Sequence, residues 1–548
     1  MIKYILYPII FIFLYSCAPE PKKNSVSIPK IDYKKELDAY FYNNFKQIDS
    51  ATEIQNVALD SVQWINSFYN NNGNKLIWIN DSIEINENGK HLIEKLSESR
   101  AYGIASSLYY TPLLYTLRQK INNVKYGNDR YKLASDVELL LTNFYMLYGK
   151  HLNYGILNSI DSITSLPRKK FLIDMPDYMY GAHIKDSLLE KLFELQPTHK
   201  QYDKLQRKLV DYLNTSSLST ENVKVENFRV DSIKAIIQSK KALVLHNYLD
   251  TIINDSLYTG ALKKFQLEHG LKPDGVIGKN TAMALSMSPY EYYQTLSANL
   301  ERWRWKDKLP SEFIFANIPS FQLKVYDKDI VKLISKIVVG KEKNQTPELK
   351  DSIQYVIAYP YWNVPRKISV EELLIKAQKD STFLKSNNYE VLTYRRDSVK
   401  IDTVNWNEMN EDNFNYLIRQ KGGSSNALGF VKFIFPNKYA IYLHDTPSKR
   451  YFNYESRAYS HGCVRVEKAM QLADYILESD KNEYTLDSIY KFIDMKKEKT
   501  IKLKKSLPVY LYYFTASVDE NEKLIFYSDI YGYDKKLIAQ IAEQYLIN

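Results

Sequence analysis

The sequence changes character along its length, and this change is the strongest constraint on the fold. From about Tyr33 to Thr220, apolar residues recur every three or four positions, as in helices with one buried face. From about Ser297 onward, short runs of β-branched and aromatic residues replace that pattern, and several alternate strictly between apolar and polar. The sequence therefore predicts an α+β multidomain protein, all-α at its N-terminal end and β-rich at its C-terminal end.

Particular runs carry these expectations. The clearest helical stripe consists of Leu133, Val137, Leu140, Leu141, Phe144 and Leu147. The expected strands are Phe313–Ile318, Gln322–Tyr326, Val331–Val339, Tyr355–Ala358, Phe430–Phe435, Ala440–Leu443, Val509–Phe514 and Lys523–Ser528. One further helix is expected near Glu467–Glu478.

At 548 residues the chain is too long for one hydrophobic core, and we expect about three to four domains. The predicted divisions are 1–17 (signal peptide), 18–32 (tether), 33–220 (α-helical scaffold), 228–288 (small three-helix module) and 297–548 (β-rich domain with an inserted capping subdomain at 367–423). The formal charge is +10, but 74 basic and 64 acidic residues are mixed throughout. We therefore expect no binding to nucleic acid.

The N-terminus has the form of an export signal. A basic start and a short apolar run from Tyr4 to Tyr15 precede Cys17, and the run is too short for a comfortable membrane span. Leu14-Tyr15-Ser16-Cys17 resembles a bacterial lipoprotein box, which implies cleavage before Cys17, lipidation of its thiol and membrane attachment. Plain secretion and an uncleaved anchor are the alternatives. All of them place the body of the protein outside the cytoplasm, and we expect a periplasmic lipoprotein.

Residues 261–285 are expected to form a helix, a tight loop and a second helix. Gly270 suits a helix C-cap, and Asp274-Gly275 is a strong turn dipeptide. The region resembles a peptidoglycan-binding module through residues in the family's order: Phe265-Gln266, His269-Gly270-Leu271, Asp274-Gly275, Gly278 and Thr281. The alternative is that the module survives only as a structural spacer.

Cys463 and His444 form the candidate catalytic pair. The chain has 2 cysteines, and a free thiol is mostly protonated at neutral pH, so a nucleophilic cysteine needs a neighbouring base. His444 ends an expected strand, whereas Cys463 precedes an expected helix whose N-terminus would stabilise a thiolate. The amides of Gly462 and Cys463 are candidates for holding an oxyanion.

At these residues the sequence resembles the L,D-transpeptidases, in particular their large multidomain branch. The similar strings are His444, Ser460-His461-Gly462-Cys463-Val464-Arg465, Trp303-Arg304-Trp305, Gln345-Thr346-Pro347, Pro360-Tyr361-Trp362-Asn363-Val364-Pro365, Asn426-Ala427-Leu428-Gly429, Phe435-Pro436-Asn437 and Asp529-Ile530-Tyr531-Gly532. The resemblance implies an exported bacterial enzyme that acts on the stem peptides of peptidoglycan.

The resemblance also implies roles for individual residues. Cys463 would be the nucleophile and His444 its base, while His461 would hold the thiolate or orient the loop that contains Gly462. Arg465 would fix the loop or a substrate carboxylate. The remaining expected substrate contacts are Ser460, Tyr361, Trp362 and Asn363. We leave open whether Asp445 or a backbone carbonyl orients His444.

No metal or cofactor is expected. The histidines outside the motif are not spaced as metal ligands, and cysteines are too few for a zinc site: His91, His151, His183, His199, His246 and His269. Trp303, Trp305 and Trp362 either line a groove for glycan or stem peptide or pack in the core.

The implied reaction is acyl transfer through a thioester on Cys463. D-Alanine leaves a tetrapeptide stem, and an amine of a second stem accepts the acyl group, giving a 3-3 crosslink in cell-wall biogenesis. Water as acceptor would make the protein an L,D-carboxypeptidase, and a protein amine would give lipoprotein attachment. A non-catalytic peptidoglycan-binding lipoprotein is the rival from another class, and other cell-wall synthesis or hydrolysis enzymes are candidate partners. A papain-like protease is disfavoured because there the cysteine precedes the histidine.

Overall fold

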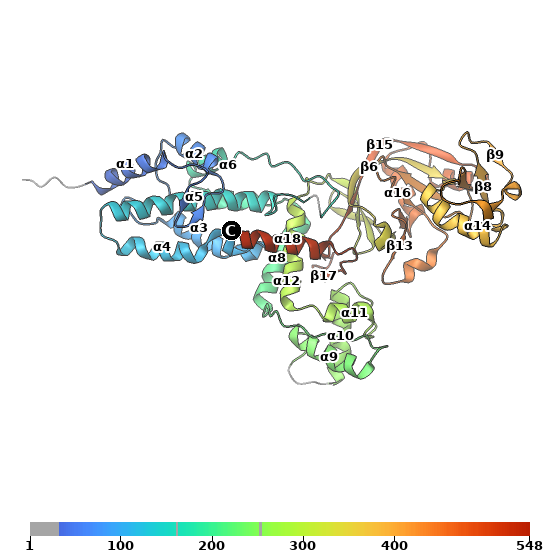
Figure 1. The fold of residues 1–548 in the computed structure, drawn as a ribbon, viewed down its shortest axis with the longest axis horizontal. Helices are drawn as coiled ribbons and strands as arrows, with labels where there is room; N and C mark the ends of the chain where they lie inside the picture. Colours follow the sequence, from blue (N-terminus) through green and yellow to red (C-terminus); the bar gives the residue numbers. More distant parts are fainter. Residues whose placement is uncertain (1–31, 161–162, 251–254, 548) are drawn as a thin grey trace, which may run out of the picture.

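The computed structural model describes residues 32–160, 163–250 and 255–547. The chain is an α+β multidomain protein, with an elongated helical part, a small helical module and a β-rich part that carries an inserted subdomain (Figure 1). The predicted signal peptide, the predicted lipidation of Cys17 and most of the predicted tether fall on residues outside the described ranges. Among the described residues no helix is both long and apolar enough to cross a membrane.

The helical part is built around α5 (Asn128–Tyr154), most of whose residues are buried because other helices surround it. The predicted stripe that includes Leu133 and Phe144 lies on this helix. The surrounding helices are α1 (Tyr33–Phe45), α2 (Val62–Asn71), α3 (Glu87–Ser97), α4 (Thr111–Asn123), α6 (Met175–His183), α7 (Leu188–Glu194) and α8 (Lys200–Thr215). Short elements complete it: β1 (Glu53–Ile54), β2 (Val57–Ala58), and the 3-10 helices η1 (Ser99–Tyr102) and η2 (Ser106–Tyr109).

The small module consists of α9 (Ser232–Leu245), α10 (Asp255–Glu268) and α11 (Lys279–Leu285). The side chain of Gln266 holds its loop closed, accepting from the amide of Gly275 at 2.8 Å and donating to the carbonyl of Val276 at 3.0 Å. His269 is buried against Phe526 of the β-rich part, with ring centroids 5.3 Å apart. The signature residues of the module therefore hold its own loop and its contact with the β-rich part.

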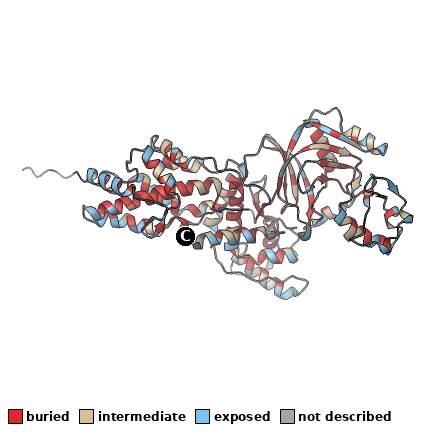
Figure 2. Cartoon of the chain, turned by 45° about the horizontal axis from the view of Figure 1, so that its top comes forward, coloured by how far each residue is buried: buried red, intermediate tan, exposed pale blue. Residues whose placement is uncertain are grey.

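Helix α12 (Pro289–Arg304) joins the helical and β-rich parts. Ser288 and Glu291 form a capping box at its start, and residues all around the helix are buried. The chain returns to it at the end, because α18 (Tyr533–Ile547) packs against α12 (Figure 1). In Figure 2 buried residues run through the central helices and the sheet.

The β-rich part contains a nine-stranded sheet in the order β13-β5-β14-β12-β11-β6-β15-β3-β4, and β4 also pairs with β5, so the sheet curls closed. Its strands are β3 (Glu312–Asn317), β4 (Gln322–Asp327), β5 (Ile330–Gly340), β6 (Leu349–Ala358), β11 (Val431–Ile434), β12 (Leu443–His444), β13 (Ala458–Ser460), β14 (Val464–Val466) and β15 (Lys499–Tyr512). The accompanying elements are η3 (Glu342–Asn344), η7 (Lys449–Asn453), α16 (Ala469–Ser479), α17 (Leu486–Asp494), β16 (Ala516–Val518) and β17 (Leu524–Phe526).

The insertion forms a compact subdomain with its own core, which includes Leu384, Trp406 and Phe414. Its four-stranded sheet has the order β7-β10-β8-β9. Its elements are β7 (Trp362–Asn363), α13 (Arg366–Ile368), the π-helical turn η4 (Ser369–Leu374), α14 (Ile375–Lys379), α15 (Phe383–Ser386), β8 (Tyr389–Leu392), β9 (Ser398–Val399), η5 (Ile401–Thr403), η6 (Trp406–Glu408) and β10 (Leu417–Gln420).

Candidate active site

Two short parallel strands carry the candidate catalytic pair. β12 pairs with β14 so that Leu443 lies opposite Val464 and His444 lies opposite Arg465. Leu443 and Val464 are buried in the core of the sheet. Because successive side chains of a strand point to opposite faces, His444 and Arg465 share the other face, and Cys463, two residues before Arg465, continues it.

His444 is held as a neutral base. Its side chain is buried, and its Nδ1 lies 2.5 Å from the backbone oxygen of Asp445. A carbonyl oxygen only accepts, so Nδ1 carries the proton and Nε2 keeps the free lone pair. Burial lowers the pKa of His444 to about 3, and the cations of Arg465 and Lys432 act in the same direction. The imidazole is therefore neutral at pH 7 and can accept a proton at Nε2.

Cys463 is a free cysteine on this face. Burial raises the pKa of its thiol, while Tyr442, Lys432 and Arg465 oppose that shift. The thiol and the imidazole are thus both neutral at rest. For Cys463 to act as a nucleophile, its thiol must therefore give up a proton to a base.

The prediction that a helix N-terminus lies next to Cys463 and stabilises its thiolate was wrong. Strand β14 follows the cysteine, and helix α16 begins only at Ala469. The field of a helix terminus acts within about one turn, so α16 does not stabilise the sulfur.

Tyr442 belongs to the site and was missed from the sequence. Its hydroxyl contacts the Cys463 thiol and the Trp362 side chain, and its ring meets the His444 ring edge-on with centroids 5.6 Å apart. The Nζ of Lys432 lies 4.0 Å from the centroid of the Tyr442 ring. Strand alternation could have found it, because Tyr442 is two residues before His444 and faces the same side.

The loop that carries Gly462 is fixed by its own side chains. Ser460 Oγ donates to the carbonyl of Cys463 at 2.6 Å and accepts from the amide of Gly462 at 3.1 Å. Ser460 is buried, so its hydroxyl braces the loop, whereas we expected it to contact substrate. The Gly462 amide is also engaged, contrary to the expectation that it faces an oxyanion, and the Cys463 amide is the candidate that remains. Gly462 has a φ of 119°, which favours glycine.

His461 points toward the inserted subdomain. Its Nε2 pairs with the carboxylate of Glu372, which lies on the π-helical turn η4. This contact links the loop of Cys463 to the insertion. Of its two expected roles, orienting the loop therefore fits this geometry better than holding the thiolate.

The other expected substrate contacts surround this face. The guanidinium of Arg465 lies 5.6 Å from the centroid of Tyr451, and burial lowers its pKa. Trp362 and Asn363 form β7 at the start of the insertion; Asn363 is exposed, and Trp362 contacts Tyr442. The guanidinium of Arg419 makes a cation–π contact with the Tyr361 ring, 4.8 Å from its centroid.

The carboxylate of Asp445 bonds to segments that flank His444. It accepts from the amide of Phe430 at 3.0 Å and from Nζ of Lys449 at 2.6 Å. The backbone carbonyl of Asp445, and not its carboxylate, orients His444.

Trp303 and Trp305 pack in the core and do not reach this face. Trp303 stacks on Phe514 with centroids 4.3 Å apart, and Trp305 donates its indole N–H to Glu301 at 3.1 Å. Within the described ranges, no cluster of three or more His, Cys, Asp or Glu side chains could hold a metal ion.

The sheet thus brings a buried histidine at the end of β12 and a free cysteine just before β14 to one face. Comparison with known proteins names the class: residues 311–485 match the family described as "L,D-transpeptidase catalytic domain" (YkuD), and residues 63–209 match a family described as "Scaffold domain". The chain therefore carries an L,D-transpeptidase catalytic domain, which contains both His444 and Cys463.

Individual relatives agree with this assignment. A Haemophilus influenzae protein named "Putative L,D-transpeptidase" is 38% identical over 231 residues, which is 42% of this chain and 46% of that protein. The match thus spans about half the length of the curated relative. A solved L,D-transpeptidase (Yku) from Stackebrandtia nassauensis covers 54% of this chain and 97% of its own, at 13% identity and a TM-score of 0.19, and so carries no structural argument.

Proposed function

We propose that this protein is a cysteine-dependent L,D-transpeptidase that forms 3-3 crosslinks between peptidoglycan stems. The observation that carries the proposal is the shared face of β11, β12 and β14, on which neutral His444, the Cys463 thiol and the cations of Lys432 and Arg465 lie together inside the matched domain.

The chemistry follows from the protonation states. The Cys463 thiol gives its proton to Nε2 of His444 as the sulfur attacks the carbonyl carbon of the diamino acid at stem position three. In this proposal the Cys463 amide stabilises the oxyanion. His444 then protonates the departing nitrogen of D-alanine, the C–N bond breaks, and a thioester remains. An amine of a second stem attacks the thioester, loses a proton to His444 and releases the sulfur.

The inserted subdomain supports transfer over hydrolysis. Trp362 at its start contacts Tyr442, and Glu372 of η4 pairs with His461, so the insertion contacts both the cysteine loop and the segment that carries His444. A cover of this kind would exclude water from the thioester, which favours an amine acceptor. L,D-carboxypeptidase activity is the alternative outcome.

The setting of the enzyme is also a proposal. A lipid anchor on Cys17 and a tether would hold the body at a membrane in the periplasm, within reach of the wall. For the module of α9 to α11 we favour the spacer role, because Gln266 and His269 are used in internal and interdomain contacts.

The test uses the purified full chain and disaccharide-tetrapeptide stems, with products separated by mass spectrometry. Wild type should give crosslinked dimers and free D-alanine, and Cys463→Ala should give neither while keeping its circular dichroism spectrum. Wild-type rates from Cys463→Ala would overturn the mechanism. If wild type converts the tetrapeptide to tripeptide without forming dimers, the protein is an L,D-carboxypeptidase. Membrane fractionation of Cys17→Ala separately tests the anchor.

A further inference from the structure

We propose that Thr346 is a positioning residue of this active site: it fixes the peptide between Gly462 and Cys463, and Tyr531 holds it in place. The inference rests on the proposed function for its catalytic meaning. Its geometric content, that Thr346 and Tyr531 set the placement of Cys463, stands on contacts outside the catalytic pair.

Thr346 makes the direct contact with the catalytic loop. Its Oγ1 donates to the carbonyl of Gly462 at 2.7 Å and accepts from the amide of Gly340 at 2.8 Å. The residue has no exposed surface, so no water can substitute for either bond. A side chain at Gly340 would meet the carbonyl oxygen of Asn344 at 2.0 Å, which shows how closely these segments pack.

Tyr531 fixes Thr346 from behind. Its phenol donates to the carbonyl of Gly340 at 2.6 Å and accepts from the amide of Thr346 at 3.2 Å. Burial raises the pKa of Tyr531 to about 12, so the phenol stays protonated and keeps its donor at working pH. One hydroxyl thus joins the segment of Gly340 to the segment of Thr346.

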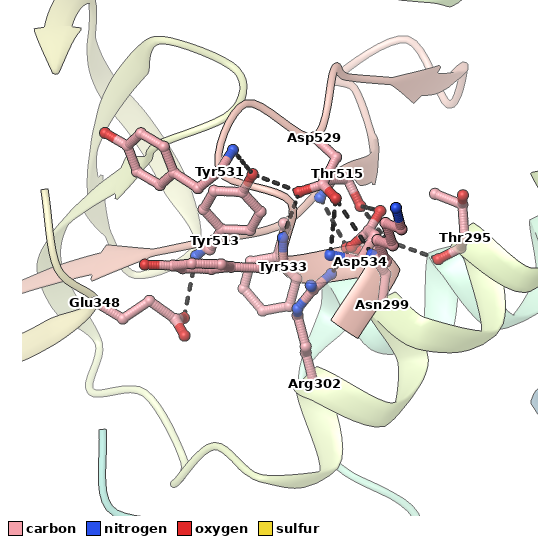
Figure 3. Close-up of polar contacts among 12 residues, drawn as sticks. Thr295, Asn299, Arg302, Glu348, Tyr513, Thr515, Asp529, Tyr531, Tyr533 and Asp534 are labelled. Carbon is pink, nitrogen blue, oxygen red and sulfur yellow. Dashed lines mark hydrogen bonds and ion pairs between the residues drawn. The ribbon is translucent and has the colours of Figure 1, made fainter. Parts of the chain in front are cut away.

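Tyr531 is in turn part of a network drawn in Figure 3. Its amide donates to the hydroxyl of Tyr513 at 2.9 Å, and that hydroxyl donates to Asp529 at 2.6 Å. Asp529 also accepts from the amides of Tyr533 and Asp534 at 2.9 Å, and so caps the start of α18.

The same network reaches the helical part. Asp534 pairs with the buried Arg302 of α12, and Thr515 donates to Asp534 at 2.6 Å (Figure 3). Asn299 of α12 donates to Thr515 at 2.8 Å. The position of Tyr531 is therefore set by the packing of α12 and α18, far from Cys463 in the sequence.

The consequence for catalysis follows from the planar peptide bond. In a trans peptide the carbonyl of Gly462 and the N–H of Cys463 point in opposite directions. When Thr346 holds the carbonyl on one side, the N–H faces the other. Because Ser460 already takes the Gly462 amide, the Cys463 N–H is the donor whose direction matters, and oxyanion donors act only when fixed in advance.

The test compares Thr346→Val, which removes the hydroxyl at nearly constant shape, with Thr346→Ser, which retains it. Thioester formation on a tetrapeptide stem should slow about 10- to 100-fold in Thr346→Val with KM unchanged, as expected when a catalytic group is misplaced. Thr346→Ser should recover to within about threefold of wild type. Equal rates in wild type and Thr346→Val, or equal losses in both variants, would overturn the proposal.

Two additions keep the outcome decisive. If Thr346→Val does not fold, Tyr531→Phe replaces it with the same expectation. Tyr475→Phe is the matched control, since its phenol on α16 bonds Glu312 of β3 and none of the residues of this network. If wild type transfers no acyl group, the proposed function fails by itself. In that case the placement of Cys463 is tested by the pH profile of its alkylation by iodoacetamide. The profile should differ from wild type in Thr346→Val but not in Thr346→Ser. Identical profiles in wild type and Thr346→Val would overturn the inference.

Discussion

The dipeptide His-Gly occurs in the module, at His269-Gly270, and in the catalytic loop, at His461-Gly462, with very different surroundings. In both the glycine has a positive φ, 62° and 119°. His269 is buried and stacks on Phe265 with centroids 3.8 Å apart, and a side chain at Gly270 would meet Tyr527. His461 is partly exposed and pairs with Glu372.

A third histidine sharpens the contrast. Burial lowers the pKa of both His269 and His444 to about 3, so neither burial nor pKa distinguishes structure from chemistry. What differs is the neighbourhood. In both, Nδ1 lies close to a backbone carbonyl oxygen, at 2.7 Å in His269 and 2.5 Å in His444. His269 is otherwise surrounded by aromatic rings, whereas His444 shares its face with a thiol and two cations. The comparison shows that the proposed base role of His444 depends on the thiol and cations on its face, and not on burial or a low pKa.

The largest expected effect separates these two buried histidines by activity. His444→Gln removes the base and should slow thioester formation about 10²- to 10⁴-fold. His269→Gln lies outside the site and should keep the rate within about threefold while lowering the melting temperature. Rates measured on the same tetrapeptide stem check both, and a His444→Gln rate equal to wild type would contradict the assignment.

The sequence predicts the long helices of the fold, and where its predictions fail the reason is physical. The stripe through Leu133 and Phe144 is long and periodic, and α5 contains it. The strand that places Cys463 has only three residues, Val464–Val466, too few for alternation to stand out from the helix expected after it. Strand alternation would have placed Tyr442 on the same face as His444, because the two are two residues apart.

Long-range contacts lie beyond any local pattern. Nothing near Thr346 in the sequence indicates that its hydroxyl meets Gly462 or that Tyr531 lies behind it, because these partners come together only when the sheet closes. The same holds for Glu372, whose partner His461 belongs to another domain segment.

The second prediction concerns acid stability. A histidine with a folded pKa near 3 and an unfolded value of about 6.5 favours the folded state fully above pH 6.5 and progressively less as the pH falls toward 3. Replacing His269 by Phe removes one such proton. Between pH 6 and pH 5 the wild type should lose about 1 kcal/mol more unfolding free energy than His269→Phe. Urea unfolding of the full chain at both pH values measures the difference, and parallel losses would contradict it.

A smaller effect is expected at Tyr442, which contacts the reacting sulfur. Its hydroxyl lowers the pKa of Cys463 against the effect of burial, so Tyr442→Phe should raise the thiol pKa. Alkylation by iodoacetamide should then require a higher pH. Tyr459→Phe, an exposed ring near the loop, is the control and should leave the profile unchanged. A shift of equal size in both variants would show that the hydroxyl of Tyr442 is not special.

The smallest expected effect lies at the exposed histidine of the comparison. Glu372→Gln weakens the pair with His461, and a partly exposed pair contributes at most about 1 kcal/mol. The insertion should then cover the cysteine loop less firmly, so water competes better with the acceptor amine. The ratio of tripeptide to crosslinked dimer should rise about two- to threefold.

The neighbouring carboxylate provides the matched control for that ratio. Glu371 is exposed and faces Lys367 at 3.9 Å on the same helical segment, so Glu371→Gln removes the same charge without touching His461. Added salt should raise the ratio in wild type but hardly in Glu372→Gln, because the pair it screens is already gone. If Glu371→Gln changes the ratio as much as Glu372→Gln, the effect is one of net charge. The exposed His-Gly would then be as structural as the buried one.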